Sequence, residues 1–372
     1  MGAAIVMVVV GLASCSDPPL ATPNPPTFDH DFPDPTVIRD GTTLRAYATN
    51  VGLTTTPTIS SAAVGGPWNP APTYPSAACS FCYGYPNTAD GGDALQTRPA
   101  WDTHELGTVW APAIWQPSAG KYVMYFTDRV NTGFGPRQCI GVATATTARG
   151  PYTPTGSGPI VCQADLGGSI DPSVFVTTSG GGSPKGKGKP KPSTTTAYLL
   201  FKNDGNCCGM GTFIWSQQLA SDGLSVTGSA NGLIGTGQDW ENGDAGGEPW
   251  KNLVEAPNMV YAGGSYYLFY SANWWESSNY AIGYALCTAP NSGCSKPRNG
   301  PIMASGDQGA GPGGQDVFAD GTGQLWMTYA AWAPNLIGYQ PMSNPNWQAY
   351  KRSLRFTRIS LSGGGISFGA GP

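Results

Sequence analysis

One pattern recurs five times along the chain, and it constrains the fold more than any other feature. Each copy has a short apolar stretch, a Gly-containing turn and then an aromatic-rich stretch. Two β-prone stretches around such a turn are typical of a β-hairpin. The copies are "DPTVIRDGTTLRAYAT" from Asp34, "APAIWQPSAGKYVMYFT" from Ala111, "DPSVFVTTSG…TAYLLFK" from Asp171, "APNMVYAGGSYYLFYS" from Ala256 and "QDVFADGTGQLWMTYA" from Gln315.

The spacing of the copies indicates how the hairpins are arranged. They begin at intervals of roughly 60 to 85 residues, which is longer than the period of most solenoid repeats. Strand-only units of this length are typical of propeller blades. We therefore predict an all-β fold, a five-bladed β-propeller, as a single domain over residues 29–372. The alternative is a β-sandwich whose hairpins are alike by coincidence, but a sandwich gives no reason for five copies of one order of small residue, Pro and aromatic.

Composition excludes several classes of function. Charged residues make up 11% of the 372 residues, aromatic residues also 11%, and the net charge is −4. This balance gives no electrostatic reason to expect nucleic acid or an anionic membrane as a partner. The sequence has no phosphate-binding Gly loop before a helix, no nucleophile elbow and no helical zinc motif, so nucleotide enzymes, serine hydrolases and zinc proteases are not expected.

The N-terminal stretch, "MGAAIVMVVVGLASC", has the composition of an export signal. Its apolar run is too short to span a bilayer and suits a signal peptide. The ending "LASC" resembles a bacterial lipobox, although no Lys or Arg precedes the apolar run. We expect a signal peptide over 1–15, a lipid anchor on Cys15, a Pro-rich tether over 16–28, and a location at the cell envelope or outside the cell. Ordinary secretion and a buried core strand are the alternatives.

The remaining eight cysteines fit export, because an even number in an oxidising compartment predicts disulfides. Local pairing is expected for Cys79 with Cys82, Cys139 with Cys162, Cys207 with Cys208, and Cys287 with Cys294. Connectivity stays open, above all for the adjacent pair. Zinc is a weaker interpretation, since four separated pairs without a neighbouring His do not form a compact ligand set.

Three carboxylates stand at or beside the starts of the repeats. Asp34 lies between Pro33 and Pro35, which restrict its backbone. Asp171 occupies the same place in the third copy, and Glu255 precedes that place by one residue in the fourth. Because the innermost strand of each blade faces the central channel, we predict that these side chains converge in one pocket. Like charges crowded in a partly desolvated pocket are typical of acid/base chemistry.

The motifs of the repeats resemble, as a set and in order, those of glycoside hydrolase family 43, from about Asp31 to about Ile359. They are "DFPDPTVI", "WAPAIW", "IDPSVFV", "LVEAPNMVYAGGSYYLFYSANWW" and "GPGGQDVFADGTGQLWMTY". The resemblance implies an inverting enzyme on a five-bladed propeller that acts on arabinose- or xylose-containing glycans. It matches Asp34 to the general base, Glu255 to the general acid, and Asp171 to a carboxylate that tunes the pKa of the acid. Inversion places the two working carboxyls about 6.5 to 9.5 Å apart.

Sugar sites also need apolar faces. Phe32, Trp110 and Trp274 lie beside the repeat starts and are predicted to bind substrate, and Gln315 is a candidate to hydrogen-bond a sugar or a water. No cofactor is expected to be required. A structural calcium ion in the channel is in doubt, because Gly314 stands where many relatives carry a His.

Some alternatives stay open at this stage. A carbohydrate-binding propeller without activity is one, and a retaining fructan-active propeller enzyme is another, with carboxyls about 5 to 5.5 Å apart. The linkage cleaved, endo or exo action, and the configuration of the arabinose are not fixed by the sequence. The "CSFCYGYPNTADGG" insertion is a candidate wall of the pocket, and the Gly/Pro/Lys run over 179–196 is interpreted as a flexible loop. A monomer is expected.

Overall fold

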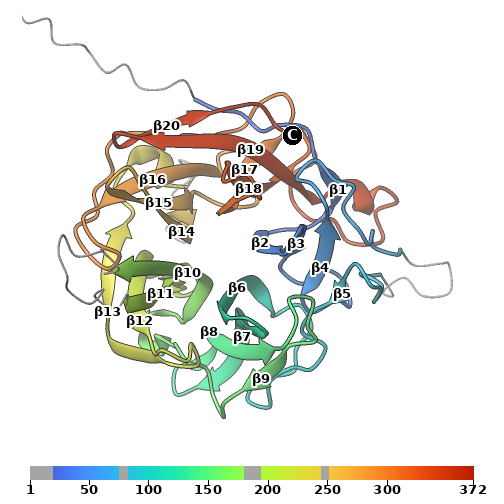
Figure 1. The fold of residues 1–372 in the computed structure, drawn as a ribbon. Coiled ribbons are helices and arrows are strands. Elements are labelled where there is room, and N and C mark those ends of the chain that lie inside the picture. Colours follow the sequence, from blue (N-terminus) through green and yellow to red (C-terminus); the bar gives the residue numbers. More distant parts are fainter. Residues whose placement is uncertain (1–19, 75–82, 180–193, 244–250) are drawn as a thin grey trace, which may run out of the picture.

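The computed structural model describes residues 20–74, 83–179, 194–243 and 251–372. Within these ranges the chain forms β-strands and short 3₁₀ turns and no α-helix. The strands belong to five separate sheets, which Figure 1 shows as blades around a common axis. The predicted all-β, five-bladed propeller is confirmed, and the β-sandwich alternative is excluded.

Each blade is an antiparallel sheet whose first strand lies nearest the axis. Blade 1 has β2 (Thr36–Asp40), β3 (Thr43–Tyr47), β4 (Pro57–Ser61) and β5 (Gly92–Asp93). Blade 2 has β6 (Trp110–Ser118), β7 (Lys121–Thr132), β8 (Gly135–Ala145) and β9 (Thr153–Thr155). Blade 3 has β10 (Ser169–Ser179), β11 (Thr194–Asn203), β12 (Phe213–Leu219) and β13 (Val226–Gly235).

The last two blades differ in how they are completed. Blade 4 has β14 (Val254–Ala262), β15 (Ser265–Ala272) and β16 (Ala281–Cys287). Blade 5 has β17 (Ala310–Ala319), β18 (Leu325–Trp332), β19 (Arg352–Ser362) and the N-terminal β1 (Phe28–Asp31), with β20 (Gly365–Phe368) also paired to β19. The described connections contain the 3₁₀ turns η1 (Ala164–Leu166), η2 (Gly205–Cys208), η3 (Asp239–Glu241) and η5 (Trp347–Ala349).

The hairpin between β14 and β15 illustrates how the repeat folds. Ala262 pairs with Ser265, which leaves Gly263 and Gly264 as a two-residue turn. Both glycines have positive φ, 56° and 88°. Such a turn matches the twist of the flanking strands, and Gly adopts it without steric cost.

The hydrophobic core lies between neighbouring blades. Each of five clusters of buried side chains combines residues from two adjacent blades, and together they complete the ring. For example, Phe126 of blade 2 packs with Tyr47 of blade 1, while Tyr267 of blade 4 packs with Met327 of blade 5. Burial of aromatic and aliphatic surface between blades is therefore what holds the ring together.

The N-terminal strand closes the ring. β1 pairs with β19, and the Phe32 amide donates to the Arg352 carbonyl. The second half of the expected tether over 16–28 lies against blades 4 and 5: the Ala21 amide donates to the carbonyl of Ile302, whose own amide bonds to β16, and the Thr27 amide donates to the carbonyl of Leu354. Backbone groups of this segment therefore find partners in the propeller.

The expected signal peptide, Cys15 and the disulfide of Cys79 and Cys82 lie outside the described residues, as does most of the loop over 179–196. In the part of the chain that the structure describes, no helix has the length and apolar character needed to cross a membrane.

A backbone kink recurs at the start of every blade. Its central residue has a positive φ: 51° at Asp34, 44° at Ala111, 55° at Asp171, 49° at Ala256 and 62° at Gly314. In blades 2 to 5 the strand pairing shifts register at this point. Left-handed backbone is unfavourable for residues other than Gly. Because it recurs at the start of every blade, where it interrupts strand pairing, this end of the blades is a candidate for a functional site.

Candidate active site

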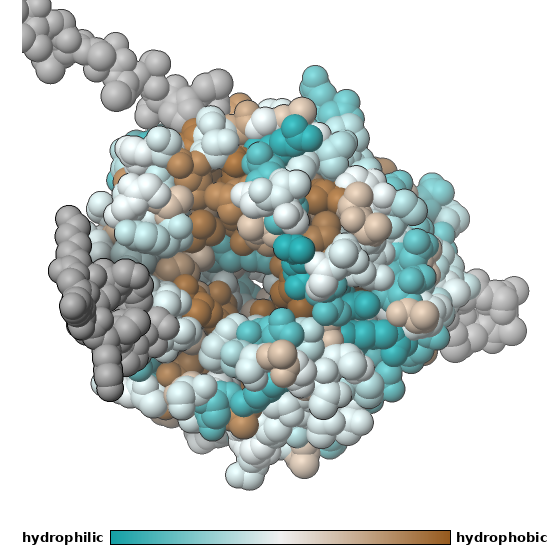
Figure 2. Space-filling model, viewed as in Figure 1, coloured by the Kyte–Doolittle hydropathy of each residue, from teal (hydrophilic) through white to brown (hydrophobic). Residues whose placement is uncertain are grey.

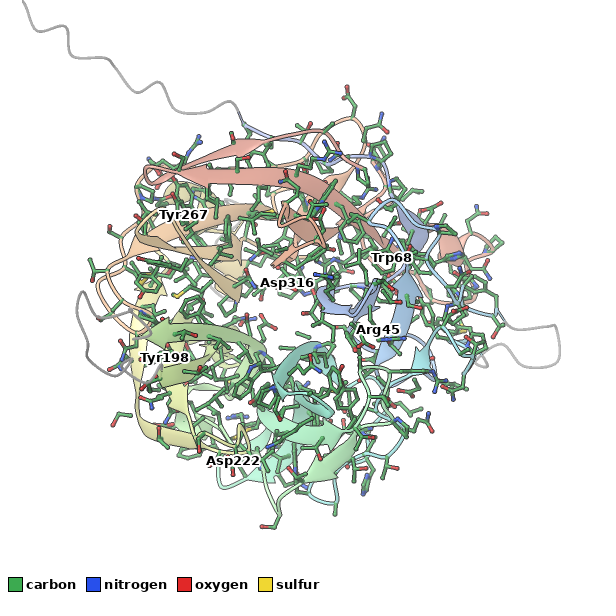
Figure 3. The ribbon with its side chains drawn as sticks, in the orientation of Figure 1. Arg45, Trp68, Tyr198, Asp222, Tyr267 and Asp316 are labelled. Atoms are coloured by element: carbon green, nitrogen blue, oxygen red, sulfur yellow. A yellow bond between two sulfur atoms is a disulfide. The ribbon has the colours of Figure 1, made fainter. Side chains whose placement is uncertain are left out.

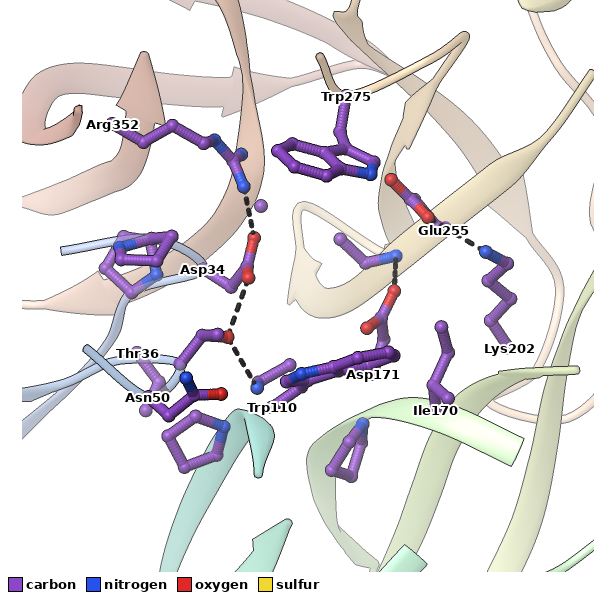
Figure 4. A pocket seen from close by; sticks show the side chains of 18 of the residues that line it. Asp34, Thr36, Asn50, Trp110, Ile170, Asp171, Lys202, Glu255, Trp275 and Arg352 are labelled. Carbon is purple, nitrogen blue, oxygen red and sulfur yellow. Dashed lines mark hydrogen bonds and ion pairs between the residues drawn. The ribbon is translucent and has the colours of Figure 1, made fainter. Parts of the chain in front are cut away.

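The kinks line one cavity of about 890 Å³ that is bordered by all five blades. Figure 2 shows the surface hollowed at the centre of the ring, with apolar and polar residues around the opening. Asp34, Trp110, Asp171, Glu255 and Gln315 come from blades 1 to 5 in turn and all line it. The predicted convergence of the three carboxylates is therefore present, and Figure 4 shows them pointing into the cavity from different walls.

Asp34 is held from two sides. Arg352 donates to Oδ1 at 2.9 Å, and the Thr49 hydroxyl donates to Oδ2 at 2.7 Å. Thr49 is itself fixed, because its oxygen accepts from the Ala111 amide at 2.9 Å. The side chain of Asp34 keeps 27% of its surface exposed, so it faces the cavity while Arg352 is buried. Burial alone lowers the pKa of Arg352, but the negative charge of Asp34 and the nearby phenol groups outweigh burial and raise that pKa above its ordinary value, so the guanidinium is a permanent cation.

Glu255 has a different set of partners. The Lys202 ammonium lies 2.9 Å from Oε2, and the Tyr280 hydroxyl donates to Oε1 at 2.7 Å. Lys202 is almost fully buried, at 1% exposure. Burial alone lowers the pKa of Lys202, but Glu255 and its neighbouring carboxylates outweigh burial and raise that pKa above its ordinary value. A buried cation is thus built into the wall beside the proposed acid.

Asp171 lies beside Glu255, and its Oδ2 accepts a hydrogen bond from the Ala256 amide at 2.9 Å. Burial of the carboxyl, followed by the negative charge of Glu255, raises the pKa of Asp171 to about 7, while Lys202 opposes the shift. Near neutral pH Asp171 therefore still carries its proton in part, beside Glu255.

The predicted aromatic substrate-binding residues do not all line the cavity. Trp110 and Trp274 line the cavity. Phe32 does not: it is fully buried, and its ring packs on Phe28 and Tyr85. The kink at Asp34 turns the chain, so nearness to Asp34 in sequence does not bring the Phe32 ring into the cavity.

Gln315 lines the cavity, but its amide is already engaged at both ends. Its oxygen accepts from the Ser271 hydroxyl at 2.6 Å, and its nitrogen donates to the Ala256 carbonyl at 2.6 Å. These bonds tie blade 5 to blade 4, and one N–H remains to meet a sugar or a water.

Sequence reasoning missed several polar residues of this cavity, among them Lys202, Tyr280, Asp316 and Arg352. Lys202 and Arg352 are cations next to aliphatic and aromatic residues, in "LLFKND" and "KRSLRF". A cation in a stretch that is expected to be buried needs a carboxylate partner, and that was the signal available in the sequence.

Asp316 lies near the axis of the ring (Figure 3). Its carboxylate accepts from the Thr36 hydroxyl at 2.9 Å, the Val37 amide at 3.0 Å and the Asn258 side-chain amide at 2.5 Å. Burial raises the pKa of Asp316, although the hydrogen bonds from Val37 and Thr36 oppose the shift. Through these bonds Asp316, on the innermost strand of blade 5, ties that blade to both of its neighbours, blades 1 and 4.

Three of the four predicted disulfides are present: Cys139–Cys162, Cys207–Cys208 and Cys287–Cys294. Cys207 also lines the cavity, through the turn η2. Among the described residues, no cluster of three or more His, Cys, Asp or Glu side chains is arranged to hold a metal ion.

Residues 86–366 match the family described as Glycosyl hydrolases family 43. The chain belongs to glycosyl hydrolase family 43. The resemblance of the blade motifs is thereby confirmed. The matched range begins after Asp34, so the place of that residue in the family 43 site rests on its position at the kink of blade 1 and on the structure around it.

Solved structures show the same family 43 architecture. A thermostable family-43 glycoside hydrolase is 20% identical, with 91% of this chain and 93% of that chain covered and a TM-score of 0.66. An endo-1,4-beta-xylanase from Bacteroides thetaiotaomicron is 22% identical, with 93% and 96% covered and a TM-score of 0.65. An alpha-L-arabinofuranosidase from Lactobacillus brevis is 16% identical, with 94% and 96% covered and a TM-score of 0.64. At such identities the likeness concerns the fold.

No curated protein matches the sequence.

Proposed function

We propose that this family 43 protein is an exported, inverting glycoside hydrolase that cleaves bonds in arabinose-containing glycans, with xylose-containing glycans as the second candidate. The observation that carries the proposal is the convergence of Asp34, Asp171 and Glu255 from three blades on one cavity, each with different partners. Different surroundings give carboxyls different protonation, which acid/base catalysis requires.

Asp34 is the proposed general base. It takes a proton from a water molecule as the water oxygen attacks the anomeric carbon on the face opposite the leaving group. The hydrogen bonds from Arg352 and Thr49 fix the orientation of the carboxylate without enclosing it. The transferred hydroxyl becomes the new anomeric hydroxyl of the sugar, with inverted configuration.

Glu255 is the proposed general acid. It gives its proton to the glycosidic oxygen as the bond from that oxygen to the anomeric carbon breaks, and it is left as a carboxylate. Lys202 and Tyr280 are placed to stabilise that carboxylate. Asp171, with a pKa of about 7, holds a proton beside Glu255 and resists a second negative charge there. Solvent returns a proton to Glu255 and removes one from Asp34 after each cycle.

The test is hydrolysis of arabinan, arabinoxylan, xylan and p-nitrophenyl pentosides by the protein from residue 16 onward, with product configuration followed by NMR. Inverted product that disappears in Glu255→Gln and in Asp34→Asn supports the proposal. Glycan binding without turnover would favour a binding propeller. Product of retained configuration, with a covalent intermediate on Asp34, would favour the retaining alternative, whose fructan substrates belong in the same panel.

We also propose export and a lipid anchor on Cys15, supported by the short apolar N-terminal run, the ending "LASC" and the disulfides in the folded part. Expression of the chain and of Cys15→Ser in a bacterial host, followed by fractionation and labelling with a fatty-acid analogue, tests it. Label on the unaltered chain alone, with release of the variant into soluble fractions, is expected. Equal distribution and no label would contradict the anchor.

A further inference from the structure

A second, smaller cavity of about 120 Å³ adjoins the catalytic one on the side of blades 1 and 5. Four residues line both cavities: Asp31, Val51, Tyr83 and Tyr339. The two spaces therefore share a wall, and a chain-like ligand that fills the first is led toward the second.

Aromatic rings form the body of the second cavity. The rings of Tyr74 and Tyr83 are stacked, with centroids 6.2 Å apart and planes inclined by 12°. Trp347, from the turn η5, meets both rings, with centroids 5.0 Å from Tyr83 and 6.1 Å from Tyr74. All three side chains are partly exposed. Flat rings that keep exposed area offer the apolar surface on which the C–H face of a sugar packs.

Polar groups border these rings. Asp31 Oδ1 accepts from the Tyr339 hydroxyl and the Arg352 amide, both at 2.9 Å. The Lys351 ammonium is engaged by Asp29, at 3.2 Å from its Oδ1. The Asp31 carboxylate and the Lys351 ammonium therefore both have partners within the protein. Gln348 adds an exposed side-chain amide at the rim of the cavity. This combination suits a neutral, hydroxyl-rich ligand better than a charged one.

We propose that the second cavity is an outer subsite, which binds a further sugar unit of the glycan that is cleaved in the first. The proposal rests on the proposed function and deepens it: the preferred substrate is an oligosaccharide or polysaccharide, and Trp347 is the main contact of the outer unit. The shared wall explains why one ligand occupies both spaces, and the aromatic rings explain why a sugar ring occupies the outer one.

The experiment compares the unaltered chain with Trp347→Ala and Trp347→Phe on arabino-oligosaccharides of increasing length and on a p-nitrophenyl pentoside. We expect Trp347→Ala to lower kcat/KM about tenfold for long substrates, mainly through KM, because burial of a sugar face on the ring is lost. The p-nitrophenyl pentoside should be unaffected, and Trp347→Phe should recover most of the loss. Tyr261→Ala is the matched control, since Tyr261 is an exposed aromatic on the β14–β15 hairpin.

Equal loss on all substrates, or no loss on any, overturns the subsite. If the unaltered chain cleaves nothing, the proposed function fails, and the subsite is then tested by binding. Titration of the same oligosaccharides should show weaker binding to Trp347→Ala for long chains only, and equal affinities for the two proteins would overturn the subsite as well.

Discussion

The Lys202 ammonium lies 2.9 Å from Glu255 Oε2 and 3.8 Å from Asp204 Oδ1, inside the wall of the cavity. A cation next to a carboxyl favours loss of the proton of that carboxyl. Lys202 accordingly opposes the raised pKa values of its two neighbours Asp171 and Asp204.

Replacement of Lys202 should shift the pH profile upward. Lys202 opposes the raised pKa of Asp171, so in Lys202→Met the proton of Asp171 is held to higher pH. The basic limb of kcat/KM is expected to move up by about one pH unit. Lys121→Met, which alters a lysine hydrogen-bonded to the Asp222 carbonyl at the surface, is the control. An unmoved basic limb in folded Lys202→Met would refute this role.

Glu255→Gln should lose activity in proportion to how much the leaving group needs a proton. On a glycan we expect a fall of about 10² to 10⁴. A dinitrophenyl glycoside, whose leaving group departs as an anion, should suffer far less. Asp34→Asn should lower the rate of hydrolysis of both substrates alike, because the attacking water must be activated in each case. Rates of both variants on both substrates check this. If Glu255→Gln lost the same factor in rate on the glycan and on the dinitrophenyl glycoside, a role of Glu255 as acid would be excluded.

Gly314→Ala should disturb Asp34. Gly314 has φ 62°, and a Cβ there would lie 2.5 Å from Asp34 Oδ1. Because misplacement of a reacting group by about 1 Å costs about a hundredfold, kcat should fall by roughly that factor. Gly263→Ala is a matched control: Gly263 has φ 56°, and a Cβ there has nothing within 4 Å. Unchanged kcat in Gly314→Ala, or the same fall in both variants, would contradict this explanation.

Asp171→Asn should stabilise the fold at alkaline pH. The folded-state pKa of about 7 lies above the ordinary value of 3.8, so the stability that this carboxyl contributes is present below the ordinary value and lost as pH rises through about 7. The melting temperature of Asp171→Asn should exceed that of the unaltered chain by roughly 2 to 5 °C near pH 8 and by little near pH 4. Asp222→Asn, at an exposed position, is the control. A pH-independent difference would be the contrary result.

The fold was predictable because the repeat is readable in each copy separately. A Gly turn between a β-prone and an aromatic stretch specifies a hairpin locally, and five such hairpins leave few architectures. The same reasoning placed Asp34 and Asp171 at matching kinks and Glu255 one residue earlier, so all three face the cavity.

Contacts made across blades were beyond that reasoning. Lys202 and Arg352 reach the carboxylates from the second and third strands of their blades, and only tertiary packing brings them there. The error at Phe32 has the reverse cause, since sequence proximity to Asp34 was taken as spatial proximity, and the kink separates them.

The pairing of β1 with β19 carries a consequence for how activity arises. Asp34 follows β1 by three residues, and Arg352 is the first residue of β19, so the proposed base and its guanidinium partner come from opposite ends of the chain. Four blades can form while this half of the site is still absent. The proposed cleavage would then begin only after β19 has been made and the ring has closed, so an unfinished chain would be inactive.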